Sequence, residues 1–366
     1  MRVLYGVCGE GMGHAMRSAV AARHLVESGC EVAVVASSRP AAEYLRRQPE
    51  LAGRVHEIVG PATAYKDNAV ALLDTVLANA LRAVIGPLAN MVPSLRVVAN
   101  PPDVVVTDFE PWSSYLAARL DKPLVSLDNI HFGSRCAHAA EVLPFRDAAA
   151  HEMYRVVADR AIPCARRYMV LSMHRPLSMR PATSLHLPLL RSEVMAARWA
   201  VSHDGPVVAY HNSHANHSSL LHEYARSGLP IRVYGAPFEV RVGSVEVLRF
   251  DDGRFLDDLR RARFVVGGAG FTLLSECWHL GKPVLAVPFG GQFEQLLNAS
   301  YVEHAGWGRR ADSLMDRTRG GNGILDVADR ADEMREAIAE GPRHDANHEC
   351  LDALLAEVRA AAREGR

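Results

Sequence analysis

Short apolar runs alternate with helix-like stretches along the chain, and this alternation constrains the fold more than any other feature. Residues 2–8 (RVLYGVC), 31–37 (EVAVVAS) and 101–109 (PPDVVVTDF) are typical of buried strands. Between the first two, residues 16–29 repeat apolar side chains at helical spacing and stop at a glycine. Strands that alternate with helices form right-handed βαβ units around a parallel sheet. The first part of the chain is therefore expected to be an α/β unit.

A second series of the same kind begins near residue 205. Strands are expected at 205–213, 230–236, 263–270 and 283–291, with helices between them. Proline and serine interrupt the pattern between the two series, and 366 residues exceed the usual size of one hydrophobic core. We therefore predict two Rossmann-like α/β domains that face each other across a cleft. The expected boundaries are a first domain over 1–175, a linker over 176–200, a second domain over 201–345, and a helix over 346–366 that packs back on the first domain.

Composition limits the partners and the compartment. The 41 Lys and Arg against 42 Asp and Glu leave no global charge to attract nucleic acid. The six cysteines contain no C-x-x-C pair, which argues against a zinc knuckle and fits a reducing compartment. No run reaches the roughly 18–20 apolar residues of a membrane-spanning helix, and the N-terminus lacks the features of a signal peptide. A cytoplasmic monomer or homodimer is expected. Arginines between 135 and 180 leave contact with a membrane or an anionic acceptor open, although a solvated helix face is the usual explanation.

The first strand runs into a glycine-rich turn, CGEGMGH, over residues 8–14. A dinucleotide fingerprint needs G-x-G-x-x-G and an acid about twenty residues on. His14 stands where the third glycine should be, and the second strand ends in Ser37 and Ser38 rather than in an acid. NAD binding is therefore disfavoured. Gly11 and Gly13 instead supply a tight turn that places His14 at a helix N-terminus beside the expected cleft.

His14 and Asp108 are the candidate base and its partner. A helix N-terminus disfavours a charged imidazole, so a neutral His14 can accept a proton at neutral pH. Asp108 ends the strand DVVVTD, and a carboxylate there would fix the tautomer and stabilise the imidazolium. The alternatives are that His14 only caps its helix, and that Asp108 caps the next helix or is a solvated acid. Glu10 and Glu110 are nearby carboxylates that could substitute as the base.

The stretch 264–308 carries the strongest signal. Gly267, Gly268 and Gly270 separate a buried strand from a helix, and the backbone N–H groups at such a helix N-terminus suit a diphosphate. Glu276 lies about one and a half turns into the helix, where a carboxylate could take both ribose hydroxyls. The next strand ends in PFGGQFEQ, and carboxylates and amides suit sugar hydroxyls because they accept and donate in pairs. The side chains expected on that rim are Gln292, Glu294 and Gln295.

These motifs resemble the GT-B nucleotide-sugar glycosyltransferases. The likeness is greatest to a bacterial and archaeal branch that begins CGEGxGH and carries GKPVL…P…EQ…NA. The chain is also similar to plant-type UDP-glycosyltransferases and to the bacterial enzyme that adds N-acetylglucosamine to lipid-linked muropeptide. The resemblance covers the first fifty residues, the VVVTDF strand and most of 200–310. It implies a GT-B enzyme that moves a sugar from a nucleotide diphosphate, expected to be UDP, to an acceptor hydroxyl, with inversion and without a cofactor. Because the cleft-facing loops contain no Asp-x-Asp motif, no obligatory metal is expected.

The resemblance also implies roles for single residues. His14 and Asp108 would form the base pair, Glu276 would bind the ribose, and Glu294 with Gln295 would bind the sugar. The diphosphate would lie on a loop formed by Gly268, Ala269, Gly270, Phe271 and Thr272. Gln292, Asn212, Ser213 and Phe250 complete the expected donor side, and Gly11, Gly13, Glu10 and Glu110 the acceptor side. The plant-type signature has histidine where this chain has Gly268, and Trp-Asn-Ser where it has Phe271–Leu273, so one side-chain contact to the phosphates is missing.

Several alternatives remain open from the sequence. The run HNSHANH spaces His211, His214 and His217 three apart, which on a helix could form a metal site, but Asn and Ser favour a donor-facing loop. A nucleotide-sugar epimerase or hydrolase of the same fold would need no acceptor. A catalytically silent nucleotide-sugar binder is the third option. The acceptor, a small molecule or a lipid-linked group, is not identified by these motifs.

Overall fold

Two seven-stranded sheets organise the computed structural model, which describes residues 1–66, 69–143, 147–211, 217–312, 314, 323–341 and 347–364. Every neighbouring pair in the first sheet is parallel. The first sheet contains, in spatial order, β11 (Thr183–His186), β9 (Arg167–Leu171), β7 (Leu124–Asp128), β6 (Val104–Asp108), β1 (Arg2–Val7), β2 (Glu31–Ala36) and β3 (Val55–Glu57).

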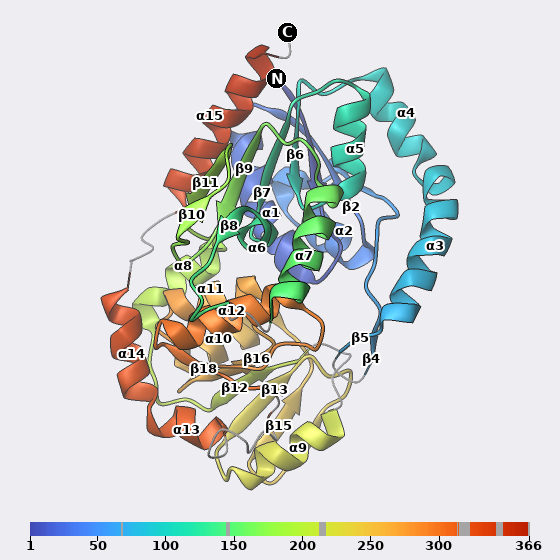
Figure 1. Cartoon of the computed structure of the whole chain (residues 1–366). Helices are drawn as coiled ribbons and strands as arrows, with labels where there is room; N and C mark the ends of the chain where they lie inside the picture. Colours follow the sequence, from blue (N-terminus) through green and yellow to red (C-terminus); the bar gives the residue numbers. More distant parts are fainter. Residues whose placement is uncertain are drawn as a thin grey trace.

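The second sheet is parallel except for β14, which lies antiparallel on one edge. It contains, in spatial order, β14 (Val240–Val242), β15 (Val245–Leu248), β13 (Ile231–Tyr234), β12 (Val207–Tyr210), β16 (Val265–Gly267), β17 (Val284–Ala286) and β18 (Gly308–Arg310). Figure 1 shows the first domain above the second, with α11 and α12 between the two sheets. The prediction of two parallel-sheet α/β domains is confirmed.

Helices cover both faces of each sheet. Strands β1 and β6 are buried along nearly their whole length, and this is why they consist of continuous Val, Leu and Tyr runs rather than an alternating pattern. The helices of the first domain are α1 (Met12–Glu27), α2 (Arg39–Arg46), α3 (Leu72–Ala89), α4 (Met91–Ala99), α5 (Pro111–Arg119), α6 (Ile130–Arg135) and α7 (Ala148–Ala161). Those that follow are α8 (Ser192–Ala197), α9 (His217–Arg226), α10 (Asp252–Arg261), α11 (Phe271–His279), α12 (Phe293–His304), α13 (Gly323–Asp329), α14 (Ala331–Glu340) and α15 (His348–Glu364).

The first domain extends further along the chain than the sequence predicts. The sequence predicts a linker over 176–200, because residues 175–191 are rich in proline and serine. The structure places β10 (Ser178–Met179) against β8 (Cys136–Ala137), and β11 against β9 at the edge of the first sheet. Strand β11 has only four residues, all half-buried, so its sequence carries no clear strand pattern. The crossing to the second domain begins after β11.

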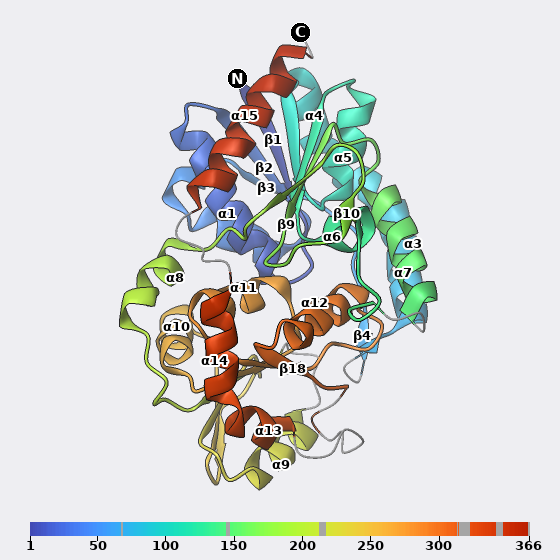
Figure 2. The ribbon, with the colours of Figure 1, turned by 60° about the vertical axis from the view of Figure 1, so that its left-hand side comes forward.

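The helix α15 returns from the second domain to the first, where it contacts α1, β6 and β7 (Figure 2). Its apolar face is buried there, with Leu354 and Val358 fully enclosed. At the base of this return, Asn347 donates to the carbonyl of Leu190 at 2.7 Å and accepts from its N–H at 3.0 Å. The two places where the chain passes between the domains are therefore tied together.

The helices α3 and α4 carry the largest set of exposed apolar side chains among the described residues. Leu73, Leu77 and Leu88 are each more than two-thirds exposed. No single described helix is long and apolar enough to span a bilayer, whereas α3 and α4, bent by 47° at their junction, pass that test as a pair by length and composition.

Candidate active site

The two glycine turns predicted from the sequence meet at the junction of the domains. The first follows β1 and leads into α1, where Gly11 has a φ of +75° and precedes the helix. The second follows β16 and leads into α11. A Cβ placed on Gly13 would lie 2.6 Å from the Thr272 hydroxyl oxygen, so only glycine allows these helix N-termini to approach so closely. The carboxyl ends of both sheets therefore contribute to one site.

His14 and Asp108 form a buried pair in this site. His14 lies in the first turn of α1, and its Nδ1 is 2.8 Å from Asp108 Oδ1 at the end of β6. Burial raises the pKa of the Asp108 carboxyl, but Arg17 and His14 outweigh burial and lower that pKa to about 2. Asp108 is therefore an acceptor at neutral pH, and the imidazole donates from Nδ1. This tautomer leaves Nε2 of His14 as the basic nitrogen.

Arg17 and Ser18 complete the environment of Asp108, and sequence reasoning missed both. Arg17 Nε donates to Asp108 Oδ2 at 2.8 Å and its Nη2 to Oδ1 at 2.6 Å, while Ser18 Oγ donates to Oδ2 at 2.8 Å. Arg17 Nη2 also lies 2.7 Å from His14 Nδ1. The two nitrogens are close because both donate to the same acceptor, Asp108 Oδ1. Their positions in the sequence could have revealed them, because Arg17 and Ser18 lie one turn after His14 on the same helix face.

The loop between β16 and α11 is shaped by close backbone contacts. Ala269 has a φ of +60°, which non-glycine residues rarely adopt, and its carbonyl accepts from Asn298 at 3.1 Å. A Cβ on Gly268 would lie 3.1 Å from the Phe289 ring. Gly270 then precedes α11, whose first-turn N–H groups have no intrahelical acceptors. Phe271, the first residue of α11, is buried with its ring 6.0 Å from the Arg17 guanidinium carbon.

The side chains predicted to bind the sugar lie in the first turn of α12 and the loop before it. Glu294 Oε1 accepts from Asn298 at 3.3 Å and, across the domain junction, from Asn129 at 2.7 Å. Gln295 accepts from the backbone N–H of Phe289 at 3.0 Å. Gln292 donates to the hydroxyl of Tyr65, which belongs to the first domain. The structure thus places Gln292 and Glu294 in contact with the first domain, and Gln295 beside the loop before α11, where a Cβ on Gly268 would lie 3.3 Å from its Oε1.

A segment of the first domain reaches over the loop that precedes α12. It contains the short strands β4 (Tyr65–Lys66) and β5 (Ala69–Val70), and the N–H of Val70 donates to the Gly290 carbonyl at 2.9 Å. Thr63 in the same segment donates to the Glu10 carboxylate. Glu10 therefore already accepts a hydrogen bond from this segment, at the edge of the junction and beside the turn that carries His14.

Glu276 lies at a different place in the junction from His14. It is 3% exposed, and its Oε1 is 3.0 Å from the guanidinium of Arg191, which also pairs with Asp252 at 3.2 Å. Burial raises the pKa of the Glu276 carboxyl, and Arg191 opposes that effect. Arg191 lies in the crossing between the domains, so its pairing with α11 was not visible in the sequence.

Glu110 differs from the sequence expectation. It was considered as a substitute base, but it is fully buried, and its two oxygens accept from the backbone N–H groups of Trp112 at 3.0 Å and Ser113 at 2.7 Å. These bonds cap α5, because the first N–H groups of a helix need acceptors from outside it. The cap that the sequence assigned as an alternative to Asp108 is thus supplied by Glu110.

The remaining candidates lie away from the pair or outside the described residues. Phe250 follows β15 and is 42% exposed, with its ring against Tyr210 and Phe255. Asn212, Ser213 and His214 lie outside the described residues. Among the residues that are described, no group of three or more His, Cys, Asp or Glu is placed to hold a metal ion.

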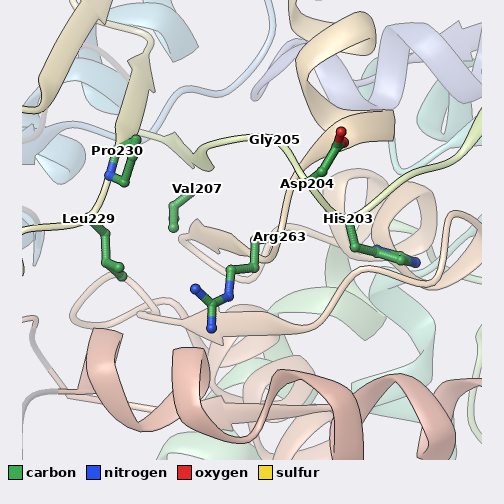
Figure 3. Close-up of a pocket in the computed structure, with 7 residues that line it drawn as sticks. All are labelled: His203, Asp204, Gly205, Val207, Leu229, Pro230 and Arg263. Carbon is green, nitrogen blue, oxygen red and sulfur yellow. The ribbon is translucent and has the colours of Figure 1, made fainter.

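A hollow of about 340 Å³ opens at the edge of the second sheet that points away from the junction between the domains (Figure 3). It lies at the amino ends of β12, β13 and β16, and Figure 3 shows Val207, Leu229 and Arg263 around it. Ligands of parallel α/β sheets bind at the carboxyl ends of the strands. This hollow is therefore separate from the junction that holds His14 and Asp108.

Comparisons with known proteins identify the family of the chain and agree with its fold. The sequence profile of Glycosyl transferase family 1 matches residues 1–321. The calicheamicin glycosyltransferase CalG4 shares 18% identity, with 99% of each chain covered and a TM-score of 0.62. LpCGTa in complex with UDP shares 17% identity over 98% of this chain and 99% of its own, with a TM-score of 0.63. UGT73P12 of Glycyrrhiza uralensis shares 14% identity over 100% of this chain and 96% of its own, with a TM-score of 0.64. No curated protein matches the sequence.

Proposed function

Because the chain belongs to Glycosyl transferase family 1 and is a glycosyltransferase of the GT-B fold, we propose that it moves a sugar from a UDP-linked donor to an acceptor hydroxyl with inversion at the anomeric carbon. The observation that carries the proposal is the contact between the two helix N-termini. It brings the buried His14–Asp108 pair beside a loop suited to a diphosphate. The nucleotide bound in one structural relative, UDP in LpCGTa, is in line with this choice of nucleotide.

The proposed step begins with proton transfer to His14. Its Nε2 takes the proton of the acceptor hydroxyl while that oxygen forms a bond to the anomeric carbon. The bond from the anomeric carbon to the diphosphate oxygen breaks, and the nucleoside diphosphate leaves with the electron pair. Asp108 stabilises the imidazolium through Nδ1. Attack from the face opposite the leaving group inverts the anomeric centre.

The glycine loop would stabilise the charge that develops on the leaving diphosphate. Backbone N–H groups at the start of α11 are fixed before the reaction, and one such donor is worth about 2.7–4 kcal/mol in well-studied sites. We assign the diphosphate to Gly268–Thr272, the sugar to Glu294 and Gln295, and the ribose to Glu276. For Glu276 this requires that the ribose hydroxyls share its carboxylate with Arg191. Gln292 and Phe250 are proposed for the sugar rim and the base side.

We propose a cytoplasmic protein that meets a small-molecule or lipid-linked acceptor, as a monomer or homodimer. The donor reaction itself needs no residue from a second copy, because both helix N-termini and the His14–Asp108 pair belong to one chain. The arginine-rich stretch over 135–180 leaves a peripheral membrane contact open, and we name no individual residues for it.

The first test of the function is donor binding followed by turnover. A UDP-sugar present at a hundred times its Kd is expected to stabilise the protein by about 2.7 kcal/mol. Released UDP is then measured with the bound donor, with and without a panel of acceptor alcohols. Transfer to an acceptor supports the proposal. Fast conversion without any acceptor favours the epimerase or hydrolase alternative, and absence of nucleotide-sugar binding contradicts the proposed function.

Replacement of the base gives the second test. His14→Ala is expected to lower kcat about 10²–10⁴-fold, because a positioned general base contributes that factor, while UDP affinity stays unchanged. His24→Ala is the matched control, since His24 lies in the last turn of the same helix. If His14→Ala retains turnover within a few-fold of the wild type, His14 is not the base.

A further inference from the structure

A hydrogen-bonded chain of side chains crosses from the first domain to the second. Arg17 Nη1 donates to Asn129 Oδ1 at 2.7 Å, and Asn129 Nδ2 donates to Glu294 Oε1 at 2.7 Å. Arg17 is itself held on both oxygens of Asp108. Asn129 therefore stands between the assembly around the proposed base and the carboxylate proposed for the donor sugar.

The amide of Asn129 has only one orientation that satisfies both neighbours. Its oxygen must face Arg17, because a guanidinium only donates, and its NH₂ must face Glu294, because a carboxylate only accepts. Asn129 is 3% exposed, so water cannot replace either partner without cost. It follows β7 directly and precedes α6, which fixes its backbone at the edge of the first sheet.

Among the described residues, hydrogen bonds reach only one of the two carboxylate oxygens of Glu294. Oε1 accepts from Asn129 and from Asn298, whereas Oε2 takes no hydrogen bond from any described residue. A carboxylate oriented in this way presents Oε2 to a ligand at a fixed angle. The angle is set from the first domain, although Glu294 belongs to the second.

We propose that Asn129 is a positioning residue that aligns the donor sugar with His14 by holding Glu294, a role that rests on the proposed sugar transfer. Transfer needs the anomeric carbon within about 3–3.5 Å of the acceptor oxygen, and a displacement of 1 Å can cost about 10²-fold in rate. A sugar that is bound but misaligned is attacked by water in place of the acceptor hydroxyl. Loss of the Asn129 bond therefore favours hydrolysis over transfer.

Asn129→Asp tests the link with little change in shape. The aspartate keeps an oxygen for Arg17 but turns a second oxygen, instead of an NH₂ group, toward Glu294. We expect kcat for transfer to fall roughly 10–100-fold and the ratio of hydrolysis to transfer to rise at least severalfold. The affinity for UDP is expected to stay within about twofold, because the loop over 268–272 is untouched.

Asn90→Asp is the matched control. Asn90 has the same 3% exposure, and it also accepts from one partner and donates to another, the N–H and carbonyl of Val59, each at 2.8 Å. Both contacts lie within the first domain. This variant is expected to transfer sugar with the wild-type ratio of products, even if it loses some stability.

Hydrogen exchange tests the same link without catalysis. In the donor-free protein, exchange at the first turn of α12 is expected to rise in Asn129→Asp and to stay unchanged in Asn90→Asp. The positioning role is overturned if Asn129→Asp keeps the wild-type transfer rate and product ratio, if it loses UDP binding together with turnover, or if exchange in α12 does not change. A wild-type protein that converts no UDP-sugar overturns the proposed function, whereas the exchange result still decides whether Asn129 holds α12.

Discussion

At the scale of single residues, Asp108 organises the site because four donors converge on its two oxygens. His14, Arg17 and Ser18 supply these donors, and Arg17 supplies two of them. A buried carboxylate is costly unless it is paired and hydrogen-bonded, and this arrangement meets both conditions. The planar guanidinium bridges both oxygens and also reaches Asn129, which an ammonium group cannot do.

Arg17→Lys is expected to keep the charge and lose the bridge. Because the Asp108 carboxylate is then free to rotate away from His14, kcat should fall about 10–100-fold. Arg23→Lys, at a half-buried pair with Glu50 on the same helix, is the control. A variant with wild-type kcat would show that the bridge to Asp108 has no part in turnover.

At the scale of elements, helix ends and helix faces determine how the site is built. The helix α12 has two different faces. Phe293, Leu297 and Tyr301, at intervals of four, pack into a cluster with residues of the first domain, including Phe132 and Tyr168. The neighbouring face, about 100° round the helix, carries Glu294 and Asn298 toward the loop before α11. One helix therefore both joins the domains and presents the side chains proposed for the sugar.

Glu110→Ala separates the capping role from a chemical role. Loss of an N-cap acceptor costs about 0.5–2 kcal/mol, so the free energy of unfolding in urea should fall by that amount. Turnover at 25 °C should stay within about twofold. The Oγ of Ser38 caps α2 by accepting from the N–H of Ala41 at 3.4 Å. Ser38→Ala removes this cap and should likewise lower stability without changing turnover. A hundredfold loss of turnover in Glu110→Ala with unchanged stability would instead restore Glu110 as a base.

Local signals made part of the site predictable. A glycine turn after a buried strand marks a helix N-terminus, and this placed His14, Asp108 and the loop over 268–272 at the carboxyl ends of their strands. The partners of those residues were not predictable in the same way. Asn129 and Glu294 are 165 residues apart, and Arg191 and Glu276 are 85 apart. Their pairing depends on how the domains pack, for which a single sequence carries no local pattern.

At the scale of the whole molecule, aromatic side chains join the two domains. The His174 ring stacks on Tyr301 at 4.7 Å, and His138 Nδ1 lies 2.8 Å from the Tyr301 hydroxyl. Burial, and then His304, lower the pKa of His174 to about 4. Burial and His151 lower the pKa of His138 to about 4, against the opposing effect of the Phe132 carbonyl. Both histidines are neutral in the folded protein at neutral pH.

This interface predicts a loss of stability in mild acid. Between pH 6.5, the ordinary pKa of histidine, and about pH 4, the pKa of both histidines in the folded protein, His138 and His174 bind protons in the unfolded chain but stay neutral in the folded one. Stability is therefore fully present above pH 6.5 and falls as the pH decreases toward 4, by at most about 1.4 kcal/mol per pH unit for each histidine. His174→Phe should flatten the dependence of Tm on pH in this window, and exposed His222→Phe should not. An unchanged slope in His174→Phe would contradict this assignment.

The return of α15 to the first domain has a consequence for biosynthesis. While the ribosome is still making the second domain, the strip of α1, β6 and β7 that α15 covers stays bare. That strip is apolar, and Leu354, Val358 and Ala361 seal it only after some 160 further residues have emerged beyond the crossing at Leu190. The first domain therefore emerges from the ribosome first but is completed last, when α15 has been made. Until then its apolar strip is exposed and needs protection from aggregation.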